Sequence, residues 1–305
     1  MQDERYELFR RCFPFTVRED AVARNILHHE GNRVFEKRLD GQLIGAAVVN
    51  ENAILMLCVD EAHRRQGYGT ALLMEAEEAI RQGGHAEAIV GCGFDYLTPG
   101  VPTSKRYFPA VNERLYEGLD DSASRFFEHR GYAHSWGGNC FDMRFPLSEF
   151  AECGDRIDDT IDGITYRWAT IADFDMVAAC LEDACPDFAP YYRNPWLYDP
   201  NSRERALIAV SGGEAVGALI VSLATEGEGL GSVGCTAVRT ACRGQRIATR
   251  LVTLGTAYLK ERDMREAYLG YTYSGLDHLY GRAGYRICAY YMMAKKKLSE
   301  SIVSE

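Results

Sequence analysis

The residues best suited to chemistry lie in a short basic, glycine-containing block that occurs twice. The first copy runs from Val59 to Leu72 and the second from Val238 to Leu251, with Val, Ala, Arg, Gln, Thr and Leu recurring in register. In each copy a predicted strand ends, a turn follows and a helix starts at once. A helix N-terminus offers unpaired backbone N–H groups and the positive end of the macrodipole. The block therefore predicts a site for a phosphate-bearing cofactor.

The side chains of the first copy favour the same interpretation. Gly67 and Gly69 let the backbone approach a phosphate because they carry no Cβ, and Arg64 and Arg65 supply charges that pair with phosphate oxygens. An ordinary α/β turn also carries Gly-x-Gly, so the recurrence of the block is what favours a binding loop. A P-loop is excluded because no Gly-Lys-Ser/Thr follows, and the pattern is a poor match to a dinucleotide-binding fold.

Two further blocks repeat in the same order, which predicts two copies of one domain. Upstream, 41–46 matches 213–218, and downstream Phe127-x-x-x-Gly131 matches Tyr280-x-x-x-Gly284. The acidic, turn-rich segment 153–163 separates the copies, which gives domains 1–154 and 155–305. The first copy is longer mainly through residues 96–120, which are rich in Pro and aromatic residues and are interpreted as an ordered insertion.

Strands and helices are predicted to alternate within a copy. Thr170 and Asp173 form a capping-box pattern that opens a helix. Strands are predicted at 205–210, 215–222, 232–238, 267–273 and 286–295, and helices at 247–260 and 276–282. The fold class is therefore α/β (α+β), with a mixed sheet in each half.

Composition places the chain among soluble globular proteins, with 47% hydrophobic and 26% charged residues. Its 34 Lys and Arg against 44 Asp and Glu give a formal charge of -10, which argues against nucleic-acid binding. No apolar run is long enough for a membrane span, and no secretory signal is evident, so we expect a cytoplasmic protein. The ten scattered cysteines predict neither a metal site nor a disulfide.

The first block resembles the acetyl-CoA pyrophosphate loop of the GNAT superfamily of N-acetyltransferases. The residues that carry the resemblance are Val59, Arg64, Gly67 and Gly69, and a later signature of the family resembles Leu279-Tyr280-x-x-x-Gly284-Tyr285. Because both halves are covered, the whole chain is similar to a tandem GNAT protein, with a two-domain arrangement like that of mycothiol synthase.

The resemblance implies a mostly antiparallel sheet flanked by helices, splayed open between its fourth and fifth strands to admit the pantetheine arm. It implies acetyl-CoA as co-substrate and direct transfer of acetyl from the thioester to an amine. The implied cofactor-binding residues are Cys58, Val59, Arg64, Arg65, Gln66, Gly67, Tyr68, Gly69 and Thr70 in the first copy and Ala237, Val238, Arg243, Gly244, Gln245, Arg246, Ile247, Ala248 and Thr249 in the second.

The two copies depart from the family pattern in opposite ways. The first keeps both loop glycines but has Phe127 where the second has Tyr280. By resemblance Tyr280 is the general acid that protonates the leaving thiolate; the competing interpretation is a core aromatic. In the second copy Arg246 replaces the first glycine, and we interpret this change as tolerated. The second copy is therefore the expected catalyst, although the better glycine loop in the first keeps the reverse assignment open.

The general base and the acceptor site are less defined. Glu226 is the candidate base, acting through water, with Glu228 beside it and Glu51 roughly equivalent in the first copy; an exposed loop glutamate is the alternative for each. Carboxylates beside aromatic rings would suit a cationic amine, and surface packing is the competing explanation. The residues in question are Asp183, Asp187, Tyr191, Tyr192, Trp196 and Tyr198.

The sequence thus predicts an acetyl-CoA-dependent N-acetyltransferase that acts on a primary amine of a small molecule, such as an amino sugar, amino acid, polyamine or aminoglycoside-like compound. The alternatives are a non-catalytic acyl-CoA-binding sensor or scaffold, and a protein N-acetyltransferase. The sequence does not select the acceptor, and it does not decide whether both copies bind acetyl-CoA or what the oligomeric state is.

Overall fold

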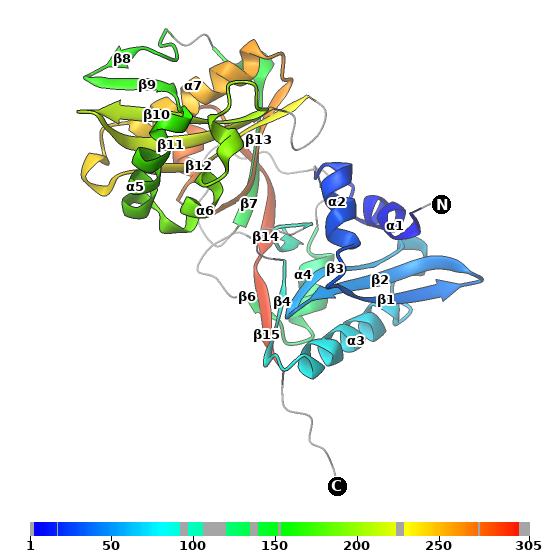
Figure 1. Cartoon of the computed structure of the whole chain (residues 1–305). Helices are drawn as coiled ribbons and strands as arrows, with labels where there is room; N and C mark the ends of the chain where they lie inside the picture. Colours follow the sequence, from blue (N-terminus) through cyan, green and yellow to red (C-terminus); the bar gives the residue numbers. More distant parts are fainter. Residues whose placement is uncertain are drawn as a thin grey trace. The chain divides into compact units, whose positions relative to one another are not determined.

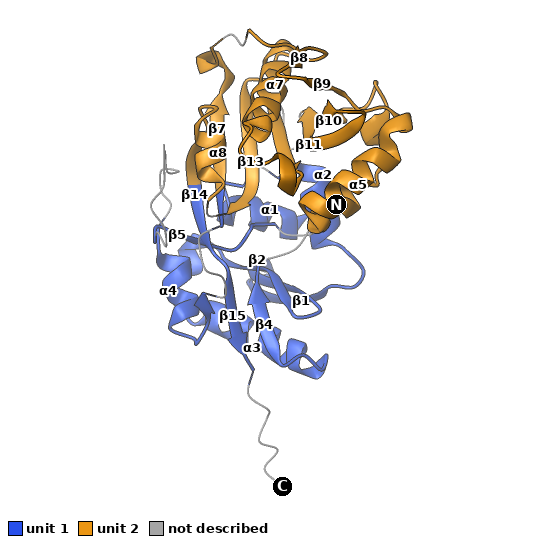
Figure 2. Ribbon diagram, turned by 90° about the vertical axis from the view of Figure 1, so that its left-hand side faces the viewer, with its two compact units in different colours: residues 1–109, 115–141, 289–305 blue, residues 110–114, 142–288 orange. Residues whose placement is uncertain are grey.

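The structure is a computed structural model that describes residues 3–16, 18–91, 97–105, 120–134, 140–151, 154–223, 229–273 and 275–298. The chain forms two compact units, coloured separately in Figure 2. Unit 1 comprises residues 1–109, 115–141 and 289–305, and unit 2 comprises residues 110–114 and 142–288. Among the described residues, none of the helices combines the length and the apolar composition that crossing a bilayer requires.

Unit 1 is built on a six-stranded sheet whose spatial order is β1-β2-β3-β4-β15-β6 (Figure 1). Strands β1 to β3 form an antiparallel meander, β4 runs parallel to β3, and β15 is antiparallel to β4 and β6. The strands are β1 (Arg33–Leu39), β2 (Gln42–Asn50), β3 (Ala53–Val59), β4 (Glu87–Val90), β6 (Ala133–His134) and β15 (Ala294–Lys297), and the helices are α1 (Glu4–Cys12), α2 (Asp20–Leu27), α3 (Tyr68–Gln82) and α4 (Ser122–Glu128).

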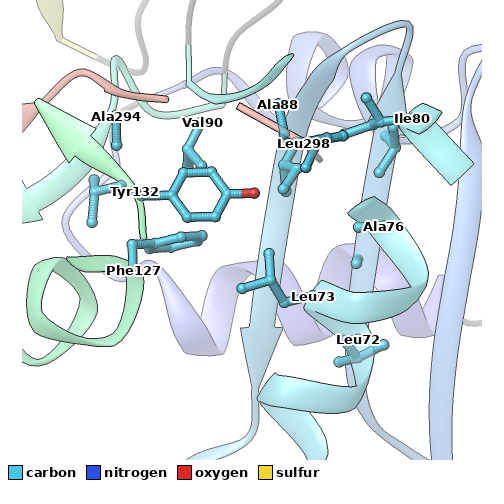
Figure 3. Packing of buried hydrophobic residues seen from close by; sticks show 14 of the residues in the cluster. Leu72, Leu73, Ala76, Ile80, Ala88, Val90, Phe127, Tyr132, Ala294 and Leu298 are labelled. Carbon is cyan, nitrogen blue, oxygen red and sulfur yellow. The ribbon is translucent and has the colours of Figure 1, made fainter. Parts of the chain in front are cut away.

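Helices cover both faces of this sheet, because β2 is apolar on both sides. Ala47 and Val49 pack in the cluster of α3, whereas Ala46 and Val48 pack in the cluster of α1 and α2. The two sets lie on opposite faces because successive side chains of a strand point alternately to the two faces of the sheet. Figure 3 shows the α3 side, where the helix meets residues from β4, α4, β15 and the chain beyond it; the labelled residues are Leu72, Leu73, Ala76, Ile80, Ala88, Val90, Phe127, Tyr132, Ala294 and Leu298.

The sheet of unit 2 repeats the plan with the strand order β5-β14-β7-β13-β12-β11-β10-β9-β8, in which β5 (Val101–Thr103), residues 140–141 of β7 and residues 289–292 of β14 are grouped with unit 1. Its antiparallel strands β9 to β12 lead to β13, which runs parallel to β12. The strands are β7 (Cys140–Pro146), β8 (Thr160–Ile161), β9 (Ile164–Trp168), β10 (Glu204–Ser211), β11 (Glu214–Leu223), β12 (Leu230–Val238), β13 (Glu266–Tyr273) and β14 (Arg286–Met292), and the helices are α5 (Phe174–Ala184), α6 (Ala189–Tyr192), α7 (Ile247–Glu261) and α8 (Asp277–Gly281).

These elements confirm the predicted mixed α/β fold, including the strands and helices expected in the second copy. The Thr170/Asp173 capping box is also present: Thr170 N donates to Asp173 Oδ2 at 2.8 Å, and the box opens a short 3-10 turn before α5. The predicted single strand 286–295 is two strands, β14 and β15. Within the predicted insertion, β5 (Val101–Thr103) pairs with the 290–292 part of β14, whereas Tyr96 and residues 106–119 lie outside the described residues.

The last strand of each sequence copy is grouped with the opposite unit. Residues 142–146 of β7 belong to unit 2, and β15 belongs to unit 1. The division into 1–154 and 155–305 remains a prediction about the sequence copies, and it does not coincide with the compact units. The reason is that strand pairing is non-local: a sequence pattern indicates that a segment is extended but not which strand it joins.

Candidate active site

The first loop connects the end of β3 to the start of α3. After Val59 the chain makes a short 3-10 turn at Glu61–His63, and α3 begins at Tyr68. Arg65 and Gly67 both have left-handed backbones, with φ of 62° and 90°. The Nε atom of Arg64 donates to Val59 O at 3.0 Å, which ties the loop to the end of the strand.

The second loop has the same backbone course between β12 and α7. Its left-handed residues are Gly244, with φ of 82°, and Arg246, with φ of 62°. Arg243 Nε donates to Val238 O at 3.3 Å, as Arg64 does in the first loop. Each loop thus has one glycine and one arginine in its two left-handed positions, in exchanged order. The predicted tolerance of Arg246 is physically reasonable, because a single non-glycine residue in this conformation costs about 1 kcal/mol, a cost that Arg65 also carries.

Both loops present an open helix N-terminus. Neither α3 nor α7, which lie wholly within the described residues, has an acidic residue in its first turn or a side-chain hydrogen bond at its N-cap. Residues 64–67 and 243–246 are exposed. The first-turn N–H groups and the adjacent arginines can therefore meet a phosphate.

The predicted cofactor residues divide among three positions in each unit. Cys58 and Val59 end β3, and Ala237 and Val238 end β12. The loops hold Arg64, Arg65, Gln66 and Gly67, and Arg243, Gly244, Gln245 and Arg246. The first helical turns hold Tyr68, Gly69 and Thr70, and Ile247, Ala248 and Thr249.

Two further residues contact the loops or their helices, and these contacts were not predicted from the sequence. Arg130 Nη2 donates to Thr70 Oγ1 at 2.6 Å, which brings a guanidinium to the first turn of α3. Asp183, predicted as a pocket wall, instead accepts a hydrogen bond from Thr240 N at 2.9 Å and supports the second loop. Nothing in the local pattern distinguishes these side chains from ordinary surface charges.

Each sheet opens beside its loop. β12 and β13 are paired only over Leu230–Ser232 and Glu266–Tyr268, at the ends far from the loop. In unit 1, β3 and β4 are paired only over Ala53–Ile54 and Ile89–Val90. Among the described residues no further pairing joins either pair of strands. The opening was predicted between the fourth and fifth strands, and the short pairing is between the parallel neighbours β3 and β4 in unit 1 and β12 and β13 in unit 2.

A β-bulge in β12 distinguishes unit 2 at this point. Between two paired positions β12 has two residues, Cys235 and Thr236, opposite Leu219 alone. Cys235 is left-handed, with φ of 48°, and its carbonyl oxygen accepts a hydrogen bond from Tyr192 Oη at 2.8 Å. Bulges redirect the backbone and side chains near active sites. The corresponding residues of unit 1, Met56 and Leu57, pair one to one with Val48 and Ala47, and the register of β3 shifts one residue earlier, at Leu55.

Tyr280 reaches this bulge from α8. Its hydroxyl lies 3.1 Å from Thr236 Oγ1, and its side chain is buried, with 4% of the residue exposed. Burial raises the pKa of Tyr280 to about 12, although the hydrogen bond with Thr236 opposes this shift. The phenol is therefore protonated at neutral pH and able to donate. Its counterpart Phe127 packs in the core of unit 1 against Tyr132 and has no proton to give.

Of the three candidate bases, the structure describes only Glu51. Glu226 and Glu228 lie outside the described residues. Glu51 is an exposed residue of the turn between β2 and β3, with φ of 49°. Glu226 therefore stays a prediction from the sequence.

The aromatic residues predicted to line an acceptor site have different positions. Tyr192 and Tyr198 are buried, and Tyr198 Oη donates to Tyr192 O at 2.9 Å, so both hold the α6 region against the sheet. Trp196 is 64% exposed and Asp187 is exposed. Tyr192 thus contacts the bulge of β12 through the carbonyl oxygen of Cys235 and does not line an exposed wall.

A separate hollow of about 560 Å³ lies on unit 1, between β1 and α3. Its lining includes Phe35 of β1 and Met74 and Glu78 of α3. It is therefore not the first loop, which lies at the start of α3.

Comparison with known proteins gives a consistent result for both halves. A family model described as "Acetyltransferase (GNAT) family" matches residues 3–95 and 171–285. A search of curated proteins found no significant match.

Solved structures of low sequence identity share the fold. A GCN5-related N-acetyltransferase from Sphaerobacter thermophilus is 21% identical with a TM-score of 0.66, over 98% of this chain and 93% of that one. A tandem GNAT protein from the clavulanic acid biosynthesis pathway is 17% identical with a TM-score of 0.67, over 98% and 95%. A GCN5-related glucosamine N-acetyltransferase region of a fungal multi-domain protein is 17% identical with a TM-score of 0.74; the match covers 96% of this chain but only 36% of that one.

Proposed function

The chain belongs to the GNAT family of acetyltransferases, and from this premise we propose that it transfers acetyl from acetyl-CoA to a primary amine of a small molecule, with unit 2 as the catalyst. The observation that carries the choice of unit is the Tyr280–Thr236 contact at the bulge of β12. In unit 1 the residues that correspond to Cys235 and Thr236, Met56 and Leu57, pair one to one with β2, and the tyrosine is replaced by Phe127.

The proposed reaction is direct attack. The neutral amine forms a C–N bond to the thioester carbonyl carbon, and the C–S bond to coenzyme A then breaks. Tyr280 gives its proton to the leaving thiolate and regains one from solvent. Its raised pKa suits this role, because the phenol stays protonated through the neutral pH range. Glu226 is the proposed base that takes the proton of the attacking amine through water.

The second loop is the proposed site for the pyrophosphate. Arg243 and Arg246 supply charge, and the first turn of α7, which contains no acidic residue of its own, supplies N–H groups. The opening between β12 and β13 is the proposed path for the pantetheine arm. Unit 1 has the same loop and opening, so we propose that it is a second acetyl-CoA site or a structural copy without catalysis.

Glucosamine is the first acceptor to assay, because one of the structures with this fold is described as a glucosamine N-acetyltransferase region. Polyamines and amino acids belong in the same panel. The non-catalytic alternative predicts acetyl-CoA binding without turnover on any amine, and the protein-acetyltransferase alternative predicts turnover on peptides alone.

The test combines calorimetric titration of acetyl-CoA with a turnover assay, for the wild type and two matched variants, Gly69→Glu and Ala248→Glu. Both positions lie second in their helices, where a carboxylate favours the helix but repels phosphate. The space at Gly69 accepts a side chain, since a Cβ there would lie 3.4 Å from Phe126. We expect Ala248→Glu to abolish turnover and Gly69→Glu to keep it. Turnover lost only with Gly69→Glu would assign catalysis to unit 1, and no binding by the wild type would overturn the proposal.

A further inference from the structure

Two thiols of unit 1 lie together beside the first loop. Cys12 ends α1 and packs, half-buried, against the apolar cluster that contains the buried Cys58 of β3. Next to them Arg11 is paired with Asp60, with Nε and Nη2 of the arginine 3.2 and 3.0 Å from Oδ2 of the aspartate. This ion pair joins the residue before Cys12 to the second residue after Cys58. It therefore holds the end of the helix against the end of the strand.

The charges around the pair make the two thiols unequal. The pKa of Cys12 is lowered, chiefly by its interaction with the Cys58 side chain and also by the Arg64 guanidinium, while burial and Asp60 oppose the shift. The pKa of Cys58 is raised well above its ordinary value by the same thiol interaction and by burial. A guanidinium beside a partly accessible thiol favours the thiolate, which is the form that reacts.

Three cysteines of unit 2 have the opposite pKa shift. Burial raises the pKa of Cys180, Cys235 and Cys288, which is the behaviour of inert thiols that fill space. Cys235 and Cys288 are half-buried, as Cys12 is, so Cys12 differs from these thiols in its lowered pKa and in sharing an apolar cluster with Cys58 beside the Arg11–Asp60 ion pair.

We propose that Cys12 and Cys58 are an oxidisable pair that closes to a disulfide when the protein meets a peroxide. The Cys12 thiolate attacks one peroxide oxygen; an S–O bond forms, the O–O bond breaks, and the released hydroxide takes a proton to become water. The Cys58 sulfur then attacks the Cys12 sulfur of this sulfenic acid; an S–S bond forms, the S–O bond breaks, and a second water leaves with the Cys58 proton. The two thiols supply two electrons, and one hydrogen peroxide becomes two waters.

The disulfide would fasten α1 covalently to β3 just before the Val59–Gly67 loop. The ion pair between Arg11 and Asp60 already brings these segments together, so the step adds a bond to an existing contact. The inference is independent of the proposed acetyl transfer, because its readout is the chemical state of two thiols.

The experiment treats the reduced full-length protein with hydrogen peroxide, blocks remaining thiols with N-ethylmaleimide and maps the peptides by mass spectrometry. We expect a linked peptide that contains Cys12 and Cys58. Cys58→Ser should lose this peptide and let a dimedone adduct accumulate on Cys12, whereas Cys12→Ser should leave Cys58 as a thiol. Cys242→Ser, a half-buried thiol of unit 2, is the control that should form the linked peptide as the wild type does.

The proposal is wrong if the wild-type protein shows no linked peptide while Cys12 remains reduced or is oxidised only to sulfinic acid. It is also wrong if Cys12 pairs with another cysteine. The wild-type peptide map is decisive even if a serine variant does not fold, and circular dichroism of each variant identifies that case.

Discussion

The hydroxyl oxygens of Thr236 and Tyr280 lie 3.1 Å apart, although the residues are 44 positions apart in the chain. The contact joins the bulge of β12 to α8, and it is made where β12 and β13 have separated. It therefore links a deformed strand, a short helix and a buried phenol at one point. At the corresponding point of unit 1, Met56 and Leu57 pair one to one with β2, and Phe127 stands in place of the tyrosine.

Replacing Tyr280 with Phe removes the proposed proton donor. We expect kcat to fall about 100-fold, with acetyl-CoA binding unchanged by calorimetry. The control is Tyr285→Phe, which removes the hydroxyl that lies 2.8 Å from Thr256 Oγ1 in the same unit. That variant should lose about 1 kcal/mol of stability but keep its turnover. Equal loss of turnover in both variants would contradict a specific role for Tyr280.

Replacing Thr236 with Val keeps the shape of the side chain and removes its hydrogen bond to Tyr280. Because that hydrogen bond lowers the pKa of Tyr280, its loss should raise the pKa further and make the phenol a weaker acid. We expect a several-fold drop in kcat with little change in KM for acetyl-CoA, and recovery in Thr236→Ser. The pH dependence of kcat provides a second measurement, since a purely structural role would not move its alkaline limb. A fall in kcat that serine does not rescue would argue against positioning by the hydroxyl.

Asp173 should make the stability of unit 2 depend on acid pH. Hydrogen bonds from Arg167, at 2.7 Å, and from Thr170 lower the pKa of this carboxyl to about 2, below its ordinary value of 3.8. The stabilisation is therefore present above pH 4 and is lost as the pH falls through 2. Asp173→Asn should cost about 2 kcal/mol at pH 7 and almost nothing near pH 2, measured by urea unfolding at each pH. Glu182→Gln, on the exposed side of α5, is the control and should change stability by less than about 0.5 kcal/mol.

Lys296 tests whether β15 completes the sheet of unit 1. Its Nζ atom lies 2.9 Å from both carboxylate oxygens of Glu77, which is buried on α3. Lys296→Ala leaves that carboxylate without its cation and should destabilise the protein by about 1 to 2 kcal/mol in thermal unfolding. The neighbouring Lys297 is exposed, so Lys297→Ala should have little effect. Equal, small effects of the two substitutions would contradict the contact.

Much of the local structure could be predicted from the sequence, because short patterns report the preferences of the backbone and the face of each element. The strand–turn–helix course of the two loops and the capping box of Thr170 and Asp173 agree with prediction, and β3 and β12 are each paired only briefly with their parallel neighbours. The choice of the second copy as the expected catalyst followed from a single difference between matched blocks, because the second copy has Tyr280 where the first has Phe127.

Other features depended on contacts between distant segments. The bulge at Cys235 and Thr236 depends on the register between β11 and β12 and is held by a hydrogen bond from Tyr192, and no local pattern contains either fact. The proximity of Cys12 to Cys58 and the placement of β15 likewise join segments that are far apart in the chain. The sequence by itself therefore determined which residues could do chemistry, and the tertiary pairing of strands decided which of them meet, because hydrogen-bond partners in a sheet are chosen between strands and not within them.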